Sequence, residues 1–462
     1  MSRFRPRTSP SGAVLAPARS APPVQPALPS QFNPPVQKSP TPVKFAEPRL
    51  GIMQQLGFWV LCAYLLSGIL NGWTMRLMGI KGYVSTVALA ALPLCWLVSG
   101  SPFRGLRQSM GWWWAGFLAW VLLATPFSIW RGGSVELLVN YLPRGYVLFF
   151  FVAALTVSFR NCRQLMYVNV AAVFMMLLTC MVFGTRADDG RYQVPGFFEN
   201  SNELAMLLLM GITQLVYLLS QKSLVGKFLA VGGIALSMPY LLWTGSRGAL
   251  LGAIAYAVLL LYMSRNRVRA LAIMTVLAAI GIASAPSAIL HRLTLLTGDE
   301  EISSKSDLSA VASRLSRLAL LKRSVSVTFS HPILGVGPGQ FPVEVMDEAR
   351  AKNEWNQYLG THNSYTQVSS ECGIPAFICY FAVIILSVRL NYKVWKRFRN
   401  RPKSADITSL AVALLSGAVV YSVTSFFFHM AYTGTLPLLA GQTVALYFAA
   451  KQRLGPNESK FV

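Results

Sequence analysis

Two short polar segments of the sequence carry side chains suited to chemistry on an anionic substrate. TGSRG (244–248) holds Arg247 between two glycines, and GTHNSY (360–365) holds His362. Arginine presents a planar fork of N–H donors that fits phosphate oxygens, and glycines let backbone N–H groups approach the same anion. A neutral imidazole, with an unperturbed pKa of about 6.5, is a candidate general base. The pair therefore predicts one anion-binding group and one base.

Each of these residues also has a purely structural interpretation. Arg247 could anchor a helix end at a membrane surface by extending its charge into water. His362 could be an ordinary polar residue of a capping segment in which Thr or Asn starts a helix. Glu371, nine residues further on, could orient the imidazole ring or be an interfacial charge. These alternatives stay open at the level of sequence.

The long polar segment from residue 286 to residue 371 is the third feature of interest, because connections of that length are normally functional. Within it, residues 313–329 place Arg314 and Arg317 at helical spacing with apolar residues, which predicts a basic amphipathic helix. A membrane-surface face is the commoner fate of such a helix. Residues 331–339 contain the glycines and prolines of a turn, and no strand precedes them as a nucleotide-binding loop requires.

The composition indicates which elements must position these residues. Of 462 residues, 54% are hydrophobic and 13% are charged, about half the charged share of a soluble domain. The net charge is +24, from 41 Lys+Arg against 17 Asp+Glu, but nucleic-acid-binding proteins are not this apolar, so no nucleic-acid partner is expected. The six cysteines have no CxxC spacing and indicate neither a disulfide framework nor a zinc site. The composition predicts an all-α integral membrane protein.

Apolar runs of roughly 17 to 23 residues recur from about residue 54, each long enough to cross about 30 Å of hydrocarbon as a helix. We expect about twelve transmembrane helices, at 54–71, 82–99, 111–130, 138–158, 165–184, 203–219, 226–243, 248–263, 268–285, 372–389, 406–428 and 431–450. Pro143 and Arg144 interrupt the fourth run, so this helix is expected to be broken or preceded by a re-entrant piece.

The distribution of basic residues predicts the orientation of these helices. Lys and Arg collect in alternate loops, which the positive-inside rule places in the cytoplasm. These loops contain Arg104, Arg107, Arg160, Arg163, Lys222, Lys227, Arg265, Arg267, Arg269 and the basic residues from Arg389 to Lys403. Both termini are then expected to be cytoplasmic, and Arg247, His362 and the large loop 286–371 before the tenth helix are expected on the outer side. Residues 1–50 hold 12 of the 26 prolines and are expected to be a disordered cytoplasmic tail that anionic membrane lipid attracts. Residues 51–450 form the membrane domain and residues 451–462 a cytoplasmic C-terminal tail.

Four motifs together resemble the O-antigen ligase and polymerase superfamily. They are GFFENSNELA (196–205), TGSRGALLG (244–252), SHPILGVGPGQF (330–341) and THNSYTQVSSECGIPAF (361–377), in the order and spacing of that family. The resemblance covers roughly residues 50 to 450. It implies a fold similar to the integral-membrane GT-C glycosyltransferases, in the bacterial inner membrane with the active site on the periplasmic face. It also implies transfer of a glycan from undecaprenyl pyrophosphate to the lipid A core or another glycan acceptor, without metal, ATP or any other cofactor.

The same resemblance assigns roles to individual residues. Arg247 matches the SRG arginine, His362 the HN histidine, and Arg314 the arginine of the outer amphipathic helix, so these three are the expected catalytic residues. The expected substrate contacts are Asn200, Asn202, Ser246, Arg317, Asn363 and Glu371. A pyrophosphate is a good leaving group, so the enzyme must supply positioning and charge stabilisation, which arginines can provide in place of Mg²⁺. No acidic cluster suits a metal, since Asp188 and Asp189 are adjacent rather than spaced.

Two other functions are compatible with parts of the pattern. A polymerase that joins lipid-linked repeat units shares the motifs with a ligase, because acceptor choice depends on the shape of the site. A transporter of lipid-linked sugars would carry charges within its spans and internally repeated halves. The charges here cluster in loops, and only one half contains the long outer segment. An inverting single displacement catalysed at the outer face is therefore the expected reaction.

Overall fold

We describe the protein from a computed structural model of the chain. It describes residues 51–79, 83–198, 200–264, 266–284, 305–351 and 359–454, apart from the side chains of residues 277, 280, 284 and 305–314. The predicted tail at residues 1–50, the first part of the large loop and the last residues of the C-terminal tail lie outside this description.

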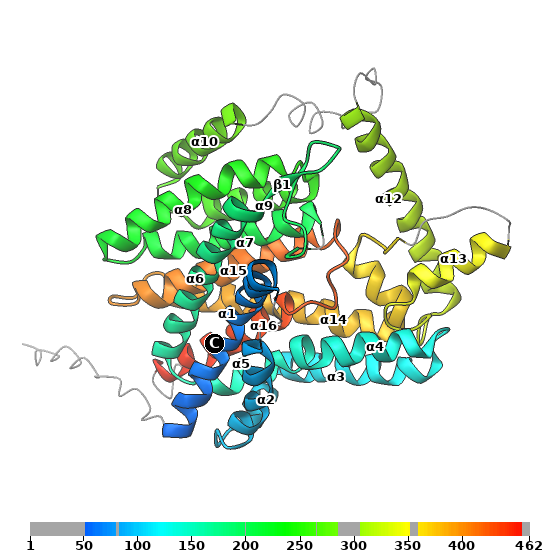
Figure 1. Cartoon of the computed structure of the whole chain (residues 1–462). Helices are drawn as coiled ribbons and strands as arrows, with labels where there is room; N and C mark the ends of the chain where they lie inside the picture. Colours follow the sequence, from blue (N-terminus) through cyan, green and yellow to red (C-terminus); the bar gives the residue numbers. More distant parts are fainter. Residues whose placement is uncertain are drawn as a thin grey trace, which may run out of the picture. The chain divides into compact units, whose positions relative to one another are not determined.

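The described residues are mostly helical (Figure 1). The helices are α1 (Ile52–Met78), α2 (Val84–Leu97), α3 (Ser109–Ala124), α4 (Arg131–Tyr141), α5 (Leu148–Leu155), α6 (Phe159–Phe183), α7 (Ser201–Leu219), α8 (Leu224–Trp243), α9 (Arg247–Met263), α10 (Arg267–Ser284), α12 (Lys305–Ser330), α13 (Phe341–Ala351), α14 (Ser364–Phe398), α15 (Ala405–Thr424) and α16 (Thr435–Gln452). Short 3₁₀ turns lie at Pro102–Arg107 and Thr125–Phe127, and a π-helical turn lies at Leu142–Tyr146. One antiparallel hairpin pairs β1 (Thr185–Arg186) with β2 (Tyr192–Gln193).

The predicted class, an all-α membrane protein, is confirmed. Within the described residues, eight helical segments are long and apolar enough to cross a membrane, and α2 and α9 are shorter apolar helices. Each of the twelve predicted runs overlaps a helix, but the number twelve itself stays a prediction. The expected break in the fourth run is confirmed, because the π-helical turn with Pro143 and Arg144 separates α4 from α5.

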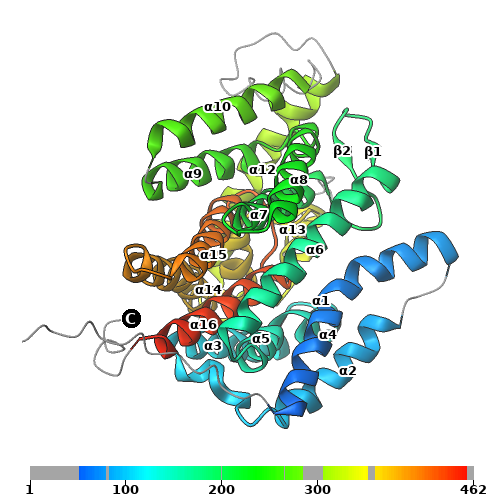
Figure 2. The same cartoon turned by 90° about the vertical axis from the view of Figure 1, so that its left-hand side faces the viewer.

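Helix α14 lies at the centre of the packing that positions the candidate residues. It contacts α3, α12, α15 and α16, while α7 packs on α6, α8, α9 and α15. Figure 1 shows α12 and α13 together on one side, next to the ends of α3 and α4. Figure 2 shows α1 and α2 side by side at the opposite edge from α8, α9 and α10. Helices α12 and α13 thus both pack on α14.

The start of α14 is locked to the Gly/Pro turn between α12 and α13. Pro375 has no N–H, so the carbonyl of Glu371 loses its partner in the helix. The N–H of Gly337 donates to that carbonyl at 2.8 Å, and the N–H of Ile374 donates to the carbonyl of Pro332 at 2.8 Å. The turn therefore satisfies the backbone groups that the kink releases, as buried backbone groups require.

Gly373 is required at this kink. Its φ is +82°, and a Cβ there would lie 2.1 Å from the carbonyl oxygen of Ile333. Gly373→Ala is expected to destabilise the protein by about 2 kcal/mol or more, because left-handed backbone strain and a steric clash coincide. Thermal unfolding of the purified variant in detergent measures the loss. Gly232→Ala is the control, since a Cβ at Gly232 meets nothing within 4 Å. Equal unfolding temperatures of the two variants would contradict the locked kink.

Candidate functional site

A small cavity at the N-terminal ends of α7 and α14 brings three of the predicted site residues together. Its lining consists of Asn200, Asn202, Glu203, His362, Phe428, His429 and Met430. Segments that are far apart in sequence therefore meet here: the start of α7, the segment before α14, and the loop between α15 and α16. This cavity is the centre of the candidate site.

His362 has a backbone conformation that few side chains adopt. Its φ is +50°, in the left-handed region, which costs roughly 1–2 kcal/mol for a residue other than glycine. The half-buried ring packs edge-on against His429, with 4.9 Å between ring centroids. Residues held in such conformations are concentrated at functional sites. The backbone at His362 thus fixes an imidazole at the edge of the cavity.

Three of the predicted substrate contacts are helix N-caps. Asn363 accepts hydrogen bonds from the N–H groups of Tyr365 (2.9 Å) and Thr366 (3.1 Å) at the start of α14. Asn200 and Ser246 cap α7 and α9 in the same way. The capping interpretation of the HN segment therefore holds for Asn363. Because these side-chain oxygens bond their own helices, their role is to orient helix N-termini, whose partial positive charge favours anions.

Arg247 begins α9 and is tied to the cavity by a second arginine. Arg191, immediately before β2, donates from Nε to the carbonyl of Thr244 (2.7 Å) and from Nη2 to Oδ1 of Asn202 (2.6 Å). The turn that carries Arg247 is thereby joined to Asn202, which lines the same cavity as His362. Sequence reasoning missed Arg191. The only signal was its position at the start of the polar segment 191–205.

The loop 425–434 completes the cavity, and the sequence prediction was wrong there. Hydropathy placed two spans almost end to end at 406–428 and 431–450, whereas α15 ends at Thr424 and α16 begins at Thr435. The loop contains the apolar residues Phe428, Met430 and Ala431, and all three are buried against protein. It supplies His429, which lines the cavity.

The same loop is bound to the start of α14 by hydrogen bonds. The N–H of Ser364 donates to the carbonyl of Ser425 (2.8 Å), and the hydroxyl of Ser364 donates to the carbonyl of Phe428 (2.5 Å). On its other side the loop packs on α9, since a Cβ on Gly248 would lie 2.6 Å from Phe427. Gly248, which follows Arg247, and Ser364, which follows the N-cap residue Asn363, thus contact the same loop. This shared contact brings the two motifs together.

Glu371 holds the Gly/Pro turn in place. The side chain is 2% exposed, so the interpretation as an interfacial charge is wrong. Its carboxylate accepts a hydrogen bond from the N–H of Gly339 (2.8 Å) and another from the hydroxyl of Tyr432. Burial raises the pKa of the Tyr432 hydroxyl well above its usual value, so it stays a donor. These bonds do not support the expected role in substrate binding or in orienting the His362 ring.

Comparison with known proteins identifies the part of the chain that contains this site. Residues 232–381 match the family model described as O-antigen ligase. This part of the chain is similar to the O-antigen ligase family. It confirms the resemblance that the four motifs predicted, and it includes Arg247, Arg314 and His362. No curated protein matches the chain. The match, together with the apolar helices, supports a multi-pass membrane enzyme of the O-antigen ligase or polymerase type.

The helix predicted at residues 313–329 is present as part of α12, and Arg317 is not among the residues that line the cavity. The side chain of Arg314 lies outside the described residues, and Arg317 is half-buried. Thr328 of α12 bonds Ser369 of α14 at 2.8 Å between hydroxyl oxygens. Arg317 lies eleven residues before Thr328 in the chain, about 16 Å along the helix axis. The catalytic role of Arg314 stays a prediction.

No ready metal site is found among the residues that the structure describes. Nowhere in that part of the chain do three His, Cys, Asp or Glu side chains gather in a way that could hold a metal ion. Of the two adjacent acids, Asp189 accepts a hydrogen bond from the N–H of Arg191 (3.2 Å) and so belongs to the hairpin turn. Among the described residues that line the cavity the carboxylate is that of Glu203, and Arg191 contacts the lining through Asn202.

Proposed function

We propose that the protein is a glycosyltransferase of the bacterial inner membrane that moves an undecaprenyl-pyrophosphate-linked glycan to an acceptor at the periplasmic face. The lipid A core or another surface glycan is the acceptor; a polymerase would use a second lipid-linked repeat unit instead. The observation that carries the proposal is the cavity that His362 shares with Asn202, joined through Arg191 to the turn that begins α9 at Arg247. The family match supports the reaction class.

The proposed reaction is a single inverting displacement. The acceptor hydroxyl oxygen attacks the anomeric carbon of the glycan, and the bond between that carbon and the pyrophosphate oxygen breaks. The pyrophosphate leaves with the bonding electron pair, still attached to its lipid. His362 takes the proton of the hydroxyl group as general base. Atoms and charges balance without any further reactant.

Charge stabilisation falls to Arg247 and to the helix ends around it. The guanidinium can bond two oxygens of the leaving pyrophosphate at once. Because the donor is preorganised, these bonds stabilise the negative charge that develops in the transition state. The N-termini of α7, α9 and α14, each with a side-chain cap, are proposed to add partial positive charge. Arg314 is proposed to supply a second guanidinium from α12. No step requires a metal ion.

The direct test is glycan transfer by the purified protein in lipid nanodiscs. A lipid-linked donor is supplied with either a lipid A core acceptor or a second lipid-linked repeat unit, and products are identified by mass spectrometry. Formation of a glycosylated acceptor together with free polyprenyl pyrophosphate is expected, and the accepted substrate separates ligase from polymerase. In sealed vesicles, a transporter would move the donor across the membrane and leave its glycan attached, which would contradict the proposal.

Removal of divalent metal is expected to leave transfer unchanged. The arginines and helix ends provide the positive charge that Mg²⁺ supplies in other pyrophosphate enzymes. The rate of transfer is measured before and after treatment with EDTA and gel filtration. A rate that falls at least tenfold and returns on addition of Mg²⁺ or Mn²⁺ would show that the arginine-based account is wrong.

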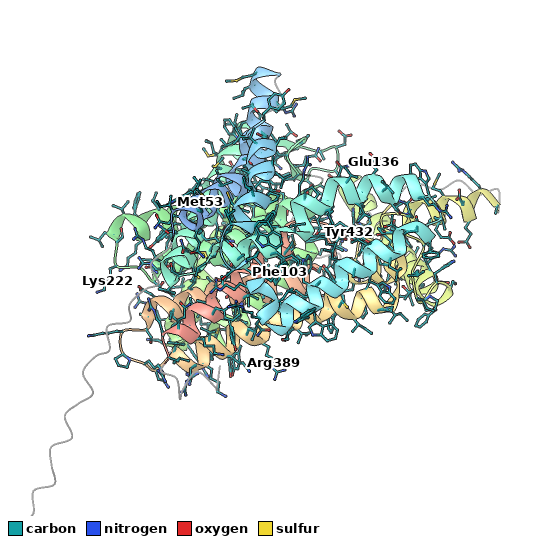
Figure 3. The ribbon with its side chains drawn as sticks, turned by 90° about the horizontal axis from the view of Figure 1, so that it is seen from below. Met53, Phe103, Glu136, Lys222, Arg389 and Tyr432 are labelled. Atoms are coloured by element: carbon teal, nitrogen blue, oxygen red, sulfur yellow. The ribbon has the colours of Figure 1, made fainter. Side chains whose placement is uncertain are left out.

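The outer position of the site predicts the behaviour of reporter fusions. The inner loops carry the basic residues, and Figure 3 shows Lys222 and Glu136 toward opposite sides of the view. A reporter that is active only in the periplasm should be active when fused near residue 300 and inactive when fused at residue 398. The reverse pattern would place Arg247 and His362 on the cytoplasmic side and would remove the basis for the proposed donor.

A further inference from the structure

A basic cleft lies at the end of α14 opposite to the segment that carries His362. It has a volume of about 620 Å³ and is formed where the connection between α9 and α10 meets the connection between α14 and α15, which Figure 2 shows on the same side. Among the described residues, no carboxylate lines this cleft. The charged lining residues are all cations, namely Arg267, Arg399, Arg401 and Lys403. Four positive charges around one concave surface favour an anionic ligand.

Local contacts fix the positions of two of these cations. The guanidinium of Arg399 packs over the ring of Trp395 at 4.8 Å, and Trp395 is buried and lines the cleft. The backbone of Lys403 has a φ of +58°, in the left-handed region that few residues other than glycine adopt. Side chains that are already ordered lose less entropy when a ligand binds. The cleft is therefore a built site and not only a basic surface.

The start of α15 also lines the cleft and adds partial positive charge. The hydroxyl of its N-cap residue, Ser404, donates to the carbonyls of Phe398 (2.7 Å) and Arg401 (2.6 Å), and no side chain caps the helix. The first N–H groups of a helix favour anions. Asp406 in the first turn does not line the cleft, and its carboxylate lies 3.6 Å from the guanidinium of Arg163 on α6. The helix end thus acts in the same sense as the four cations.

The ends of the surrounding helices indicate where an anion would come from. Helices α14 and α15 are long and apolar enough to span a membrane, and α9 is a shorter apolar helix that ends at Met263. The cleft lies where α9 and α14 end and α15 begins, which places it at a membrane surface. Tyr262 and Trp395 line it, and such aromatic residues are enriched at membrane–water interfaces. Lipid phosphates lie at this depth, and basic pockets between helix ends bind them.

We propose that this cleft binds a phosphate group at the membrane surface, with the arginines bonding its oxygens and the start of α15 adding partial positive charge. Arginine binds phosphate oxygens bidentately. The headgroup of an anionic phospholipid and a soluble phosphate compound share this chemistry, and the tests below separate them. The proposal goes beyond glycan transfer and does not depend on it, because the cleft and the His362 cavity lie at opposite ends of α14.

The first test measures binding of phosphatidylglycerol to the purified protein in a neutral detergent by native mass spectrometry. Arg399→Gln combined with Lys403→Asn is expected to weaken binding about tenfold or more, because two charged contacts to phosphate are lost. Asn tolerates the left-handed backbone at this position. Lys393→Gln combined with Lys396→Gln is the matched control, since it removes the same charge from exposed side chains of α14 that do not line the cleft. Equal losses in the two double variants, or wild-type affinity in the first, would overturn the proposal.

The second test keeps all four cations and adds a negative charge to the cleft. Ser409 lines the cleft from α15, so Ser409→Asp is expected to weaken binding of phosphatidylglycerol at least fivefold by repulsion of the phosphate. Ser223→Asp is the control, because Ser223 is the exposed N-cap of α8, where Asp caps equally well. We expect the control to bind with wild-type affinity. Wild-type affinity in Ser409→Asp as well would contradict a phosphate site in this cleft.

Comparison of two ligands identifies the source of the phosphate. Inorganic phosphate and phosphatidylglycerol are each titrated against wild type and the double variant Arg399→Gln with Lys403→Asn. A loss of affinity for phosphatidylglycerol alone assigns the cleft to a lipid headgroup, and a loss for inorganic phosphate assigns it to a soluble phosphate compound. A wild-type protein that binds neither ligand would overturn the proposal. These measurements need no glycan substrate, so their failure leaves the proposed transfer reaction standing.

Discussion

Transfer of glycan is expected to slow by about 10²- to 10⁴-fold when His362 is replaced by Ala, because the acceptor hydroxyl loses its general base. Binding of the lipid-linked donor should change little, since His362 acts on the acceptor. The steady-state rate of transfer in nanodiscs measures the effect. A loss of less than tenfold would assign the proton to another group at the cavity, of which His429 and Glu203 are the ones that line it.

The backbone at residue 362 provides the control for this variant. His362 has a φ of +50°, which Asn adopts more readily than Ala. His362→Asn therefore keeps the start of α14 intact while it removes the imidazole. Equal losses of transfer in His362→Ala and His362→Asn are expected if the base is missing. Recovery of transfer in His362→Asn would show that the histidine serves the backbone conformation and not the chemistry.

Arg247→Lys is expected to reduce transfer by roughly 10²- to 10³-fold, comparable to the loss of one preorganised donor to a developing negative charge. Lysine keeps the charge but cannot bond two phosphate oxygens in one plane. A residue that only anchors a helix end at the membrane surface would tolerate the change. The turnover rate at saturating donor and acceptor measures the effect.

Arg186→Lys is a matched control for the Arg247 variant. Arg186 is an exposed arginine of the nearby hairpin, where its guanidinium packs over the ring of Trp243 at 5.3 Å, and it does not line the cavity. We expect Arg186→Lys to transfer at the wild-type rate. Normal transfer by Arg247→Lys would mean that the anchoring interpretation is correct and that the leaving pyrophosphate is stabilised elsewhere.

The parts of the site that sequence predicted are those where a polar residue interrupts an apolar pattern. Arg247 and His362 stood out because each lies in a short polar segment between long apolar runs, and the structure places both at helix N-termini around one loop. Pro143 likewise predicted the break in the fourth run, because proline removes a backbone donor wherever it occurs. Local chemistry was sufficient for these features.

The parts that sequence missed depend on tertiary contacts. The loop 425–434 is apolar, so most of it was assigned to the predicted spans. Its contacts with α9 and α14 bury these apolar residues without a helix. Arg191 lies more than fifty residues from Thr244, and no local pattern links the two. Glu371 was predicted as a substrate contact or a surface charge, but its partner is the N–H of Gly339, which the kink of α14 brings to it. These roles follow from packing.

One measurement tests the central claim, that His362 acts on the proton while a separate group of residues holds the donor. Wild type and His362→Ala are loaded with lipid-linked donor, excess acceptor is added, and a single turnover is followed by release of polyprenyl pyrophosphate. We predict that the variant loads donor to the same extent as wild type and releases pyrophosphate at least 100-fold more slowly. A variant that fails to load donor, or that releases pyrophosphate at the wild-type rate, would contradict this account.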